Sequence, residues 1–355
     1  MKRVLIAPLD WGLGHATRCI PIIRWLVAQK LDVRIAGSGP SLDLLSKEFP
    51  DIPRSALPGY DPRYPASRKM VTTMALQLPG FLDVIRQEHK AVDQLVREHA
   101  IDVVISDNRY GCWTTAAHCI FITHQSNILM PKRFGWLAPV VRLMNERYIR
   151  KFDTCWIPDY AEGVLAGSLI SFGRNNFHPD IRYIGPLSRF SSKVDEDVPR
   201  YDVVAVCSGP EPQRSIFERM LNEQLPNSGK RFLLVRGVTE GSATLPSGSG
   251  MVDYLTSPEM EKVLKGAGIV VARSGFSTIM DLNVLGKKAI FVPTAGQTEQ
   301  EYLAKKMKDE GIAFTMDQQY FDLKRALCES ESYSGFPSAG ANRNLNKVLT
   351  EFFFP

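Results

Sequence analysis

Residues 4–18 read Val4-Leu-Ile-Ala-Pro-Leu-Asp-Trp-Gly-Leu-Gly-His-Ala-Thr-Arg18, an apolar run followed at once by a glycine turn and a histidine. The run 4–9 is short and continuously apolar, which indicates a strand buried on both faces of a sheet. Gly12 and Gly14 suit a tight turn after a first strand, because glycine tolerates positive φ and lets the backbone approach a ligand closely. Thr17 stands where a dinucleotide-binding turn has its third glycine, so this turn departs from that pattern.

The same alternation of apolar runs and helical stretches continues along the whole chain. Helical candidates such as 14–29 and 81–99 separate short runs rich in β-branched residues. The expected strands are 33–36, 102–106, 120–123, 154–157, 202–206, 231–235, 268–272 and 289–292. Continuous apolar strands separated by helices are typical of parallel sheets covered on both faces. We therefore predict an α/β fold with two doubly wound, Rossmann-like parallel-sheet domains that face a cleft.

The composition predicts a folded chain of two domains. Of the 355 residues 44% are hydrophobic and 23% charged, which excludes a disordered or fibrous protein. The polar stretch 189–200 is typical of a linker between domains over 1–188 and 201–340. Residues 341–355 are expected to form a closing helix, for which packing back on the first domain is one option.

Targeting, redox and charge signals are weak. The first apolar run is too short for a signal peptide or a membrane span. Six scattered cysteines without a C-x-x-C pair argue against a disulfide framework or a zinc site and favour a reducing cytoplasm. Residues 1–190 carry 24 Lys and Arg against 17 Asp and Glu, whereas the remainder carries 19 against 21. The basic excess of the first half is compatible with an anionic partner or with ordinary surface chemistry.

His15 is the candidate general base of the first glycine turn. It is expected in the first turn of a helix at the carboxyl edge of the sheet, where α/β folds bind ligands. The positive end of a helix favours the neutral imidazole, which is the form that a base needs near pH 7. The alternative is a helix-start histidine without a chemical role.

A second stretch, residues 272–286, again follows a strand and opens a helix. Arg273, Ser274, Gly275, Ser277 and Thr278 gather a cation, hydroxyls and backbone N–H groups, which a phosphate or diphosphate requires. The acidic residue two turns into this helix, Asp281, can accept both hydroxyls of a ribose. The alternative is an N-terminal cap followed by a solvated aspartate.

A third stretch, residues 291–304, places Gln297 in a loop and Glu299 and Gln300 at a helix start. A carboxylate beside an amide suits the paired hydrogen bonds that sugar hydroxyls need. The alternative is a capping box formed by Thr298 and Glu301.

Together these stretches resemble the two-domain GT-B glycosyltransferases, and most strongly the family 28 group that contains the lipid II-forming peptidoglycan N-acetylglucosaminyltransferase. The resemblance covers nearly the whole chain. It implies an N-terminal acceptor-side domain, a C-terminal domain for a nucleotide-sugar that is usually UDP-linked, and His15 as base. Direct displacement would invert the anomeric centre, and no ligand cluster calls for a metal. The donor-binding residues so implied are Gly14, Ser208, Gly209, Leu255, Arg273, Ser274, Gly275, Ser277, Thr278, Asp281, Gln297, Glu299 and Gln300.

The sequence also departs from the family pattern. Leu303 stands where the family has an asparagine three residues after the glutamine. Pro210 and Pro212 remove N–H donors from the second glycine loop, so we expect Gln213 or Arg214 to contribute more to phosphate binding.

Arg18, Asp107, Asn108 and His124 are acceptor-side candidates. The last three follow predicted strands, so we expect them to bind the acceptor or to support His15, or else to be buried structural groups. The acceptor class is a glycan, a lipid-linked molecule or a small molecule, and nothing points to nucleic acid.

Two basic, apolar patches predict peripheral docking on anionic lipid at the inner face of the membrane. They are residues 131–151, and Arg63, Arg68 and Lys69 beside Met70, Met74 and Phe81. The alternative is ordinary amphipathic helices with cationic outer faces.

Other functions on the same scaffold remain open. Gly12–Arg18 also matches the Gly-x-Gly-His-x-x-Arg pattern of UDP-sugar hydrolases of the pseudaminic acid pathway, in which the histidine would activate water. The longer N-terminal half favours the transferase. A third interpretation is a nucleotide-sugar sensor that binds the donor without catalysing a reaction. A sugar-nucleotide epimerase is less favoured, because this sequence lacks the loops expected of that enzyme.

Overall fold

The computed structural model describes residues 2–63, 70–161, 163–172, 179–191, 198–238, 244–337 and 343–355. Its contacts divide the chain into two compact units. Unit 1 comprises Met1–Arg63, Val71–Ser188 and Asn342–Pro355, and unit 2 comprises Tyr64–Met70 and Arg189–Ala341. The division falls at the start of the stretch 189–200, of which residues 192–197 lie outside the described residues.

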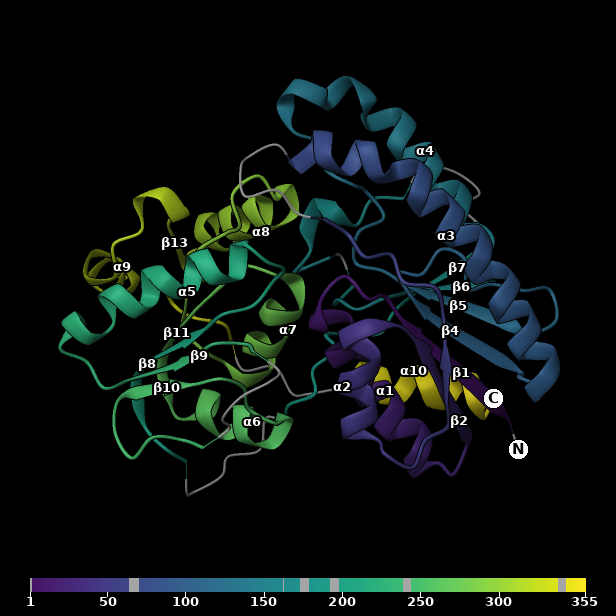
Figure 1. The fold of residues 1–355 in the computed structure, drawn as a ribbon, viewed down its shortest axis with the longest axis horizontal. Helices are drawn as coiled ribbons and strands as arrows, with labels where there is room; N and C mark the ends of the chain where they lie inside the picture. Colours follow the sequence, from purple (N-terminus) through teal and green to yellow (C-terminus); the bar gives the residue numbers. More distant parts are fainter. Residues whose placement is uncertain are drawn as a thin grey trace. The chain divides into compact units, whose positions relative to one another are not determined.

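Unit 1 is built on a parallel sheet (Figure 1). Within the described residues its strand order is β3-β2-β1-β4-β5-β6-β7. The strands are β1 Arg3–Pro8, β2 Asp32–Gly37, β3 Arg54–Ala56, β4 Val103–Asp107, β5 His118–Ile122, β6 Thr154–Ile157 and β7 Asp180–Tyr183. The order reverses between β1 and β4, whose register pairs Pro8 with Asp107. Such a reversal leaves a crevice at the carboxyl ends of the two strands, which is where α/β sheets bind ligands.

The helices of unit 1 cover the sheet because alternate strand residues point to opposite faces. They are α1 Leu13–Ala28, α2 Gly39–Glu48, α3 Met70–His99 and α4 Ala138–Ile149, with short 3₁₀ segments η1 Lys132–Leu137 and η2 Gly167–Leu169. Val92 and Val96 of α3 and Ile149 of α4 share one core cluster with Leu5 and Phe121 of the sheet. α3 and α4 therefore cover the same face.

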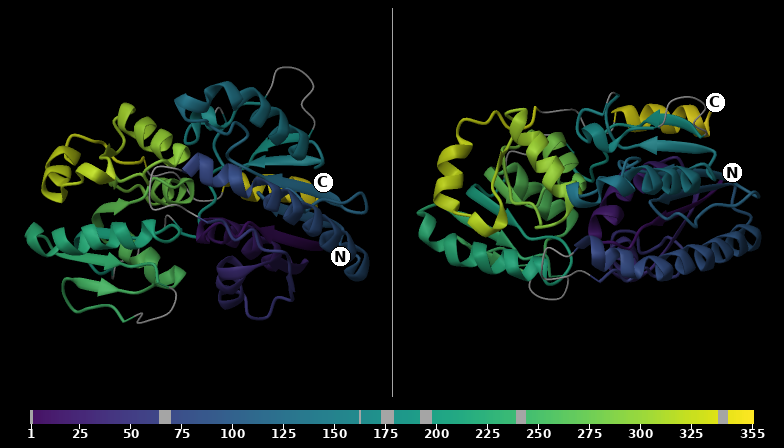
Figure 2. Two further views of the ribbon diagram at one scale, coloured as in Figure 1. Left: turned by 45° about the horizontal axis from the view of Figure 1, so that its top comes forward. Right: turned by 90° about the horizontal axis from the view of Figure 1, so that it is seen from above.

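The helix α10, Arg343–Phe353, packs on unit 1 although it follows unit 2 in the chain. It buries Leu345, Leu349 and Phe353. Phe353 lies 5.9 Å from the ring of Trp25, and the neighbouring Phe352 meets Trp156 edge-on at 5.9 Å. Figure 2 shows the helix, in yellow, running along the sheet of unit 1. The face of the sheet opposite α3 and α4 is thus closed in part by a distant segment.

Unit 2 repeats the architecture with the strand order β10-β9-β8-β11-β12-β13 among its described residues. The strands are β8 Tyr201–Val206, β9 Phe232–Val235, β10 Gly250–Val252, β11 Ala267–Ala272, β12 Ala289–Phe291 and β13 Phe314–Thr315. The helices are α5 Gln213–Gln224, α6 Ser257–Lys265, α7 Phe276–Leu285, α8 Thr298–Asp309 and α9 Leu323–Ser330, with η3 Pro226–Ser228 and η4 Gln318–Tyr320. The strand order of this sheet reverses between β8 and β11. The last residues of these two strands, Val206 and Ala272, are paired in register.

The predicted fold class is confirmed, and every strand expected from the sequence is present. The strands that the sequence analysis missed are β3, β7, β10 and β13, which are the edge strands of the two sheets. Each has two to four residues and few buried positions. Short strands at a sheet edge bury little, so their sequences carry no apolar run to recognise.

We predict that Leu349→Ala destabilises unit 1 by about 2–5 kcal/mol, because it removes a fully buried side chain at the contact between α10 and the sheet. Urea unfolding followed by tryptophan fluorescence measures this, since Trp25 and Trp156 lie against the same helix. Lys347→Ala on the exposed side of α10 is the control and should stay within about 0.5 kcal/mol of the parent protein. Equal losses in the two variants would contradict this packing.

Candidate active site

The turn between β1 and α1 carries the first helical residues over the carboxyl edge of unit 1. Gly12 has a φ of +96°, where a side chain would be strained, and no atom lies within 4 Å of its β-carbon position. Asp10 fastens the turn, because its carboxylate accepts hydrogen bonds from the Ser38 hydroxyl at 2.8 Å and from the Tyr60 backbone N–H at 3.0 Å. His15 follows in the first turn of α1, beside Gly14.

The buried ion pair between Arg18 and Asp107 joins α1 to the end of β4. The Nε atom of Arg18 donates to Oδ2 of Asp107 at 2.6 Å, and Nη2 donates to Oδ1. Arg18 is 2% exposed and Asp107 is not exposed. The two parallel hydrogen bonds use the planar fork of the guanidinium, which matches a carboxylate.

Two histidine rings contact the same guanidinium. Nη2 of Arg18 lies 2.9 Å from Nδ1 of His15, and Nη1 lies 3.0 Å from Nδ1 of His124, which follows β5. Nδ1 of His15 is also 3.3 Å from Oδ1 of Asp107. An imidazole, a carboxylate and a guanidinium are therefore held in mutual contact at the crevice of unit 1.

The environment keeps His15 neutral and Asp107 charged near pH 7. Burial lowers the pKa of His15 below its ordinary 6.5, and Arg18 adds to this, while Asp107 acts in the opposite direction. Burial alone would raise the pKa of Asp107, but Arg18 and His15 outweigh it and hold that pKa well below its usual range. A neutral imidazole beside a permanent carboxylate is the arrangement that general-base catalysis requires.

The acceptor-side candidates divide into two groups. Arg18, Asp107 and His124 are buried in contact with one another, so their burial fits support of His15 rather than direct contact with an acceptor. Asn108 has a left-handed backbone with φ of +57°. Its side-chain oxygen is buried and has no hydrogen-bond partner among the described residues. Of the four residues, Asn108 is the one whose polar group stays available.

A second buried network, which the sequence analysis did not foresee, stabilises the loops around this crevice. Arg109 donates to Glu88 of α3 at 2.6 Å, to the carbonyl of Pro8 at 2.7 Å and to the hydroxyl of Ser38 at 2.7 Å. Glu88 also accepts from the Tyr60 hydroxyl at 2.9 Å. Glu88 sits inside a long helix, where no local pattern distinguishes it, and its partner is distant in the sequence.

In unit 2 the loop after β8 is open to solvent. Ser208 and Gly209 are exposed, and Gly209 has a φ of +103° with no atom within 4 Å of its β-carbon position. Arg214, expected at a phosphate, instead pairs with Glu211 and Glu218 at 2.6 Å each. Gln213 is buried. In this loop the backbone of Ser208 and Gly209 is therefore accessible to solvent, whereas the side chain of Gln213 is buried and that of Arg214 is paired with two glutamates.

Arg273 lies inside unit 2. Its guanidinium donates to the carbonyls of Val292 at 2.9 Å and Gln213 at 3.0 Å, and stands 4.2 Å from the centre of the Phe217 ring. Burial lowers its pKa to about 10. In the structure the guanidinium of Arg273 is thus held by backbone carbonyls inside unit 2, and its contact with a phosphate stays a prediction.

Ser274 and Gln300 are also directed into the fold. The hydroxyl of Ser274 donates to the backbone carbonyl of Gln300 at 2.8 Å, and the side-chain oxygen of Gln300 accepts from the backbone N–H of Thr294 at 2.9 Å. Both residues are buried. These hydrogen bonds connect the starts of α7 and α8, and the contacts of Ser274 and Gln300 with phosphate and sugar stay predictions.

The remaining candidates lie in or next to α7, at the start of α8 and in the loop before α6. Gly275 precedes this helix, provides no side-chain cap and has open space beside it. A helix start at the carboxyl edge of a parallel sheet is suited to bind an anion. Ser277, Thr278, Asp281, Gln297 and Glu299 are half-buried, whereas Leu255 is buried.

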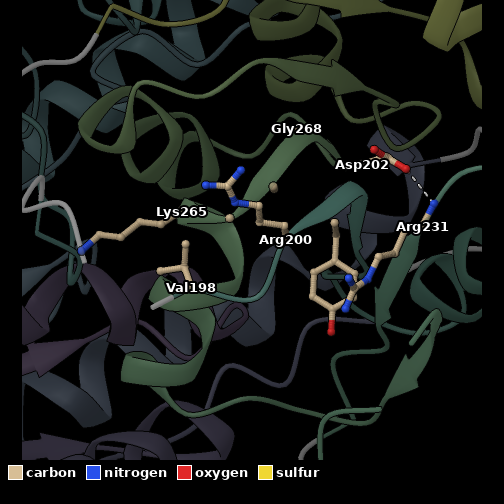
Figure 3. Close-up of a pocket in the computed structure, with 9 residues that line it drawn as sticks. Val198, Arg200, Asp202, Arg231, Lys265 and Gly268 are labelled. Carbon is tan, nitrogen blue, oxygen red and sulfur yellow. Dashed lines mark hydrogen bonds between the residues drawn. The ribbon is translucent and has the colours of Figure 1, made fainter. Parts of the chain in front are cut away.

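A cavity of about 530 Å³ lies at the opposite, amino edge of the unit 2 sheet. It is lined by Arg200, Arg231 and Lys265 among others, and contains none of the predicted donor residues. Figure 3 shows Lys265 extending away from the two arginines, so the cations do not converge on a common ligand. Across the described parts of the chain, no three His, Cys, Asp or Glu side chains are placed to hold a metal ion.

The chain is similar to known glycosyltransferases in sequence and in fold. Residues 234–343 match the model of the glycosyltransferase family 28 C-terminal domain. An uncharacterized glycosyltransferase of Methanosarcina acetivorans is 25% identical over 93% of this chain and 91% of its own length. The UDP-N-acetylglucosamine--N-acetylmuramyl-(pentapeptide) pyrophosphoryl-undecaprenol N-acetylglucosamine transferase of Sulfurihydrogenibium is 27% identical over 35% of this chain and 37% of its own. The fold is similar to the crystal structure of the glycosyltransferase of kitacinnamycin, with a TM-score of 0.67 and 17% sequence identity. This match covers 99% of this chain and 98% of the other chain. The last likeness shows a GT-B fold.

We predict that Arg273→Met destabilises unit 2 by about 1–3 kcal/mol or more, because buried carbonyls lose their donor. Thermal unfolding measures the effect. Arg325→Met, at a solvent-exposed guanidinium in the same unit, is the control and should leave the midpoint nearly unchanged. A stable Arg273→Met protein would contradict the structural role.

Proposed function

The chain is a glycosyltransferase of the GT-B fold, similar to glycosyltransferase family 28, and we propose that it moves a sugar from a nucleotide donor to an acceptor hydroxyl with inversion of the anomeric carbon. In this proposal unit 1 binds the acceptor and unit 2 binds the donor. The observation that carries it is the contact of His15 with buried Asp107 and Arg18 at the carboxyl ends of β1 and β4.

His15 acts as the general base. Its Nδ1 atom is engaged with Arg18 and Asp107, so Nε2 is the nitrogen for the acceptor hydroxyl. As the acceptor oxygen forms a bond to the anomeric carbon, Nε2 of the tautomer that is protonated on Nδ1 takes the proton of the hydroxyl. The bond from that carbon to the diphosphate breaks, and its electron pair leaves with the nucleotide. Asp107 then stabilises the imidazolium by accepting from Nδ1–H, as a carboxylate partner does in other histidine bases.

The donor diphosphate binds at the start of α7, where backbone N–H groups and the helix dipole favour negative charge. Ser277 and Thr278 supply hydroxyls, and Asp281 accepts from the ribose. Gln297 and Glu299 bind the sugar, and the backbone of Leu255 meets the base. A uridine nucleotide is the favoured donor, because the Sulfurihydrogenibium relative is named for UDP-N-acetylglucosamine and the family 28 match covers this part of the chain.

The hydrolase interpretation receives no support from the comparisons. Both relatives described above are named as transferases. The Methanosarcina relative matches this chain over nearly its full length. The two activities differ in whether the proton given to His15 comes from an acceptor or from water.

We predict that His15→Gln lowers the turnover number about 10²- to 10⁴-fold, the usual contribution of a positioned base, without a comparable change in the KM for the donor. The donor is identified first by thermal shift with UDP-, GDP- and dTDP-sugars. In the parent protein the rate should fall as acid charges the imidazole, at a pH below 6.5, because the pKa of His15 is lowered. Release of free sugar without acceptor at the same rate as transfer would contradict the transferase and favour hydrolysis.

We also propose that unit 1 docks on anionic lipid through η1 and α4. Trp136, Val140 and Leu143 recur at helical spacing and are 75%, 55% and 65% exposed. Arg133 and Arg147 are exposed on the same segment. An exposed apolar stripe with arginines beside it suits the interface of an anionic membrane. The acceptor named for the Sulfurihydrogenibium relative is linked to undecaprenol, which fits such a location.

Within the described residues no helix combines the length and apolarity that crossing a membrane requires. Arg68 and Lys69 of the other basic patch lie outside the described residues, whereas Leu76 of α3 is 84% exposed.

We predict that Trp136→Ser with Leu143→Ser weakens binding to phosphatidylglycerol–phosphatidylcholine vesicles at least tenfold, because each side chain contributes about 1.5–3 kcal/mol when buried. Cosedimentation measures the binding, with pure phosphatidylcholine vesicles as the neutral comparison. Tyr320→Ser, which removes an aromatic ring 71% exposed in unit 2, is the control. Undiminished binding of the double variant would exclude α4 as the docking element.

A further inference from the structure

We propose that Arg18 is a positioning residue that holds neutral His15 in the tautomer with its proton on Nε2 while no acceptor is bound. A guanidinium has five N–H donors and no acceptor, so a hydrogen bond from it to a ring nitrogen requires a lone pair on that nitrogen. Nη2 of Arg18 lies at such a distance, 2.9 Å, from Nδ1 of His15. Nδ1 is then the acceptor, and the ring proton remains on Nε2. The inference rests on the proposed role of His15 as base.

Asp107 competes with Arg18 for Nδ1 but is less well placed. Its Oδ1 atom lies 3.3 Å from Nδ1, beyond the ordinary range of about 2.7–3.2 Å for an N–H···O hydrogen bond. The same oxygen already accepts from Nη2 of Arg18. The shorter contact of Nδ1 of His15 is therefore the one with Nη2 of Arg18, and in this contact Arg18 is the donor.

His124 provides a second instance of the same constraint. Its Nδ1 lies 3.0 Å from Nη1 of Arg18, so this ring also accepts at Nδ1 and carries its proton on Nε2. The thiol of Cys19 also faces the cluster, with its Sγ atom 3.8 Å from Oδ2 of Asp107. One buried guanidinium thus satisfies a carboxylate and sets the tautomer of two imidazoles.

Because of this hydrogen bond from Arg18, His15 can act as a base only after its ring proton has moved from Nε2 to Nδ1. Nε2 with a proton can donate a hydrogen bond but cannot take a proton from a hydroxyl. To become a base, the ring takes a proton from solvent at Nδ1, on the side of Asp107, and loses the Nε2 proton to solvent, with no net change in charge. Nη2 of Arg18 must release Nδ1 for this, while its bonds to Asp107 persist. While no acceptor is bound, His15 therefore does not activate water, which protects a bound donor from hydrolysis.

The tautomers can be read directly from two-bond ¹⁵N–¹H correlation spectra of histidine-labelled wild-type protein, with His15→Gln and His124→Gln providing assignments. His15 and His124 should show the proton on Nε2. His89 is an internal control with the opposite tautomer, because its Nδ1 lies 2.9 Å from the backbone carbonyl of Trp113, which can only accept. A proton on Nδ1 of His15, or an averaged signal, overturns the proposal even if His15 proves to be the base.

Removal of the guanidinium should reverse the tautomer. In Arg18→Met, His15 is expected to carry its proton on Nδ1, towards Asp107, and nucleotide release from the donor without acceptor should rise several-fold. Arg24→Met, at an exposed position of the same helix, should change neither. An unchanged His15 tautomer or release rate in Arg18→Met contradicts the proposal. The signal of His89 reports whether the Arg18→Met variant folds. If this variant does not fold, the tautomer of His15 in the wild-type spectrum decides the proposal. A normal transfer rate in His15→Gln would instead refute the proposed function.

Discussion

The ion pair between Arg18 and Asp107 is the contact on which the crevice of unit 1 depends. The register of β1 and β4 sets Pro8 level with Asp107, so the carboxylate emerges beside the first turns of α1. Both charges are fully buried, and each one needs the other because an unpaired buried charge costs several kcal/mol. The pair therefore ties a helix to a strand almost ninety residues away, and it places the imidazole of His15 against a permanent carboxylate.

Unit 2 uses buried polar groups for a different purpose. Arg273, Ser274 and Gln300 follow strand ends in the positions where ligand-binding groups are expected. Their side chains form hydrogen bonds with backbone groups of neighbouring loops and helix starts. This pairing shapes the carboxyl edge and leaves the start of α7, with Gly275 before it, open. These side chains stabilise the edge, and the proposed donor site uses the backbone and the half-buried residues beside it.

Burial also decides the electrostatics of the two units. In unit 1 a guanidinium beside a carboxylate leaves no net charge, so desolvation keeps the nearby imidazole neutral. In unit 2 the buried guanidinium of Arg273 has only carbonyl dipoles as partners, and its pKa falls. The two buried guanidinium groups therefore differ in their partners, which are a carboxylate in unit 1 and backbone carbonyls in unit 2.

The sequence by itself determined the two parallel-sheet domains, the glycine turns and the family resemblance, because apolar strand runs and glycines at turns are local features. It also located the strand ends at which polar residues gather. Tertiary structure alone decided which of those residues face solvent: Arg273, Ser274 and Gln300 turn inward, and Glu88 finds Arg109. It also decided that Arg18 meets two histidines. These outcomes depend on register and on packing between segments far apart in the chain, and burial is a property of that packing rather than of the residue.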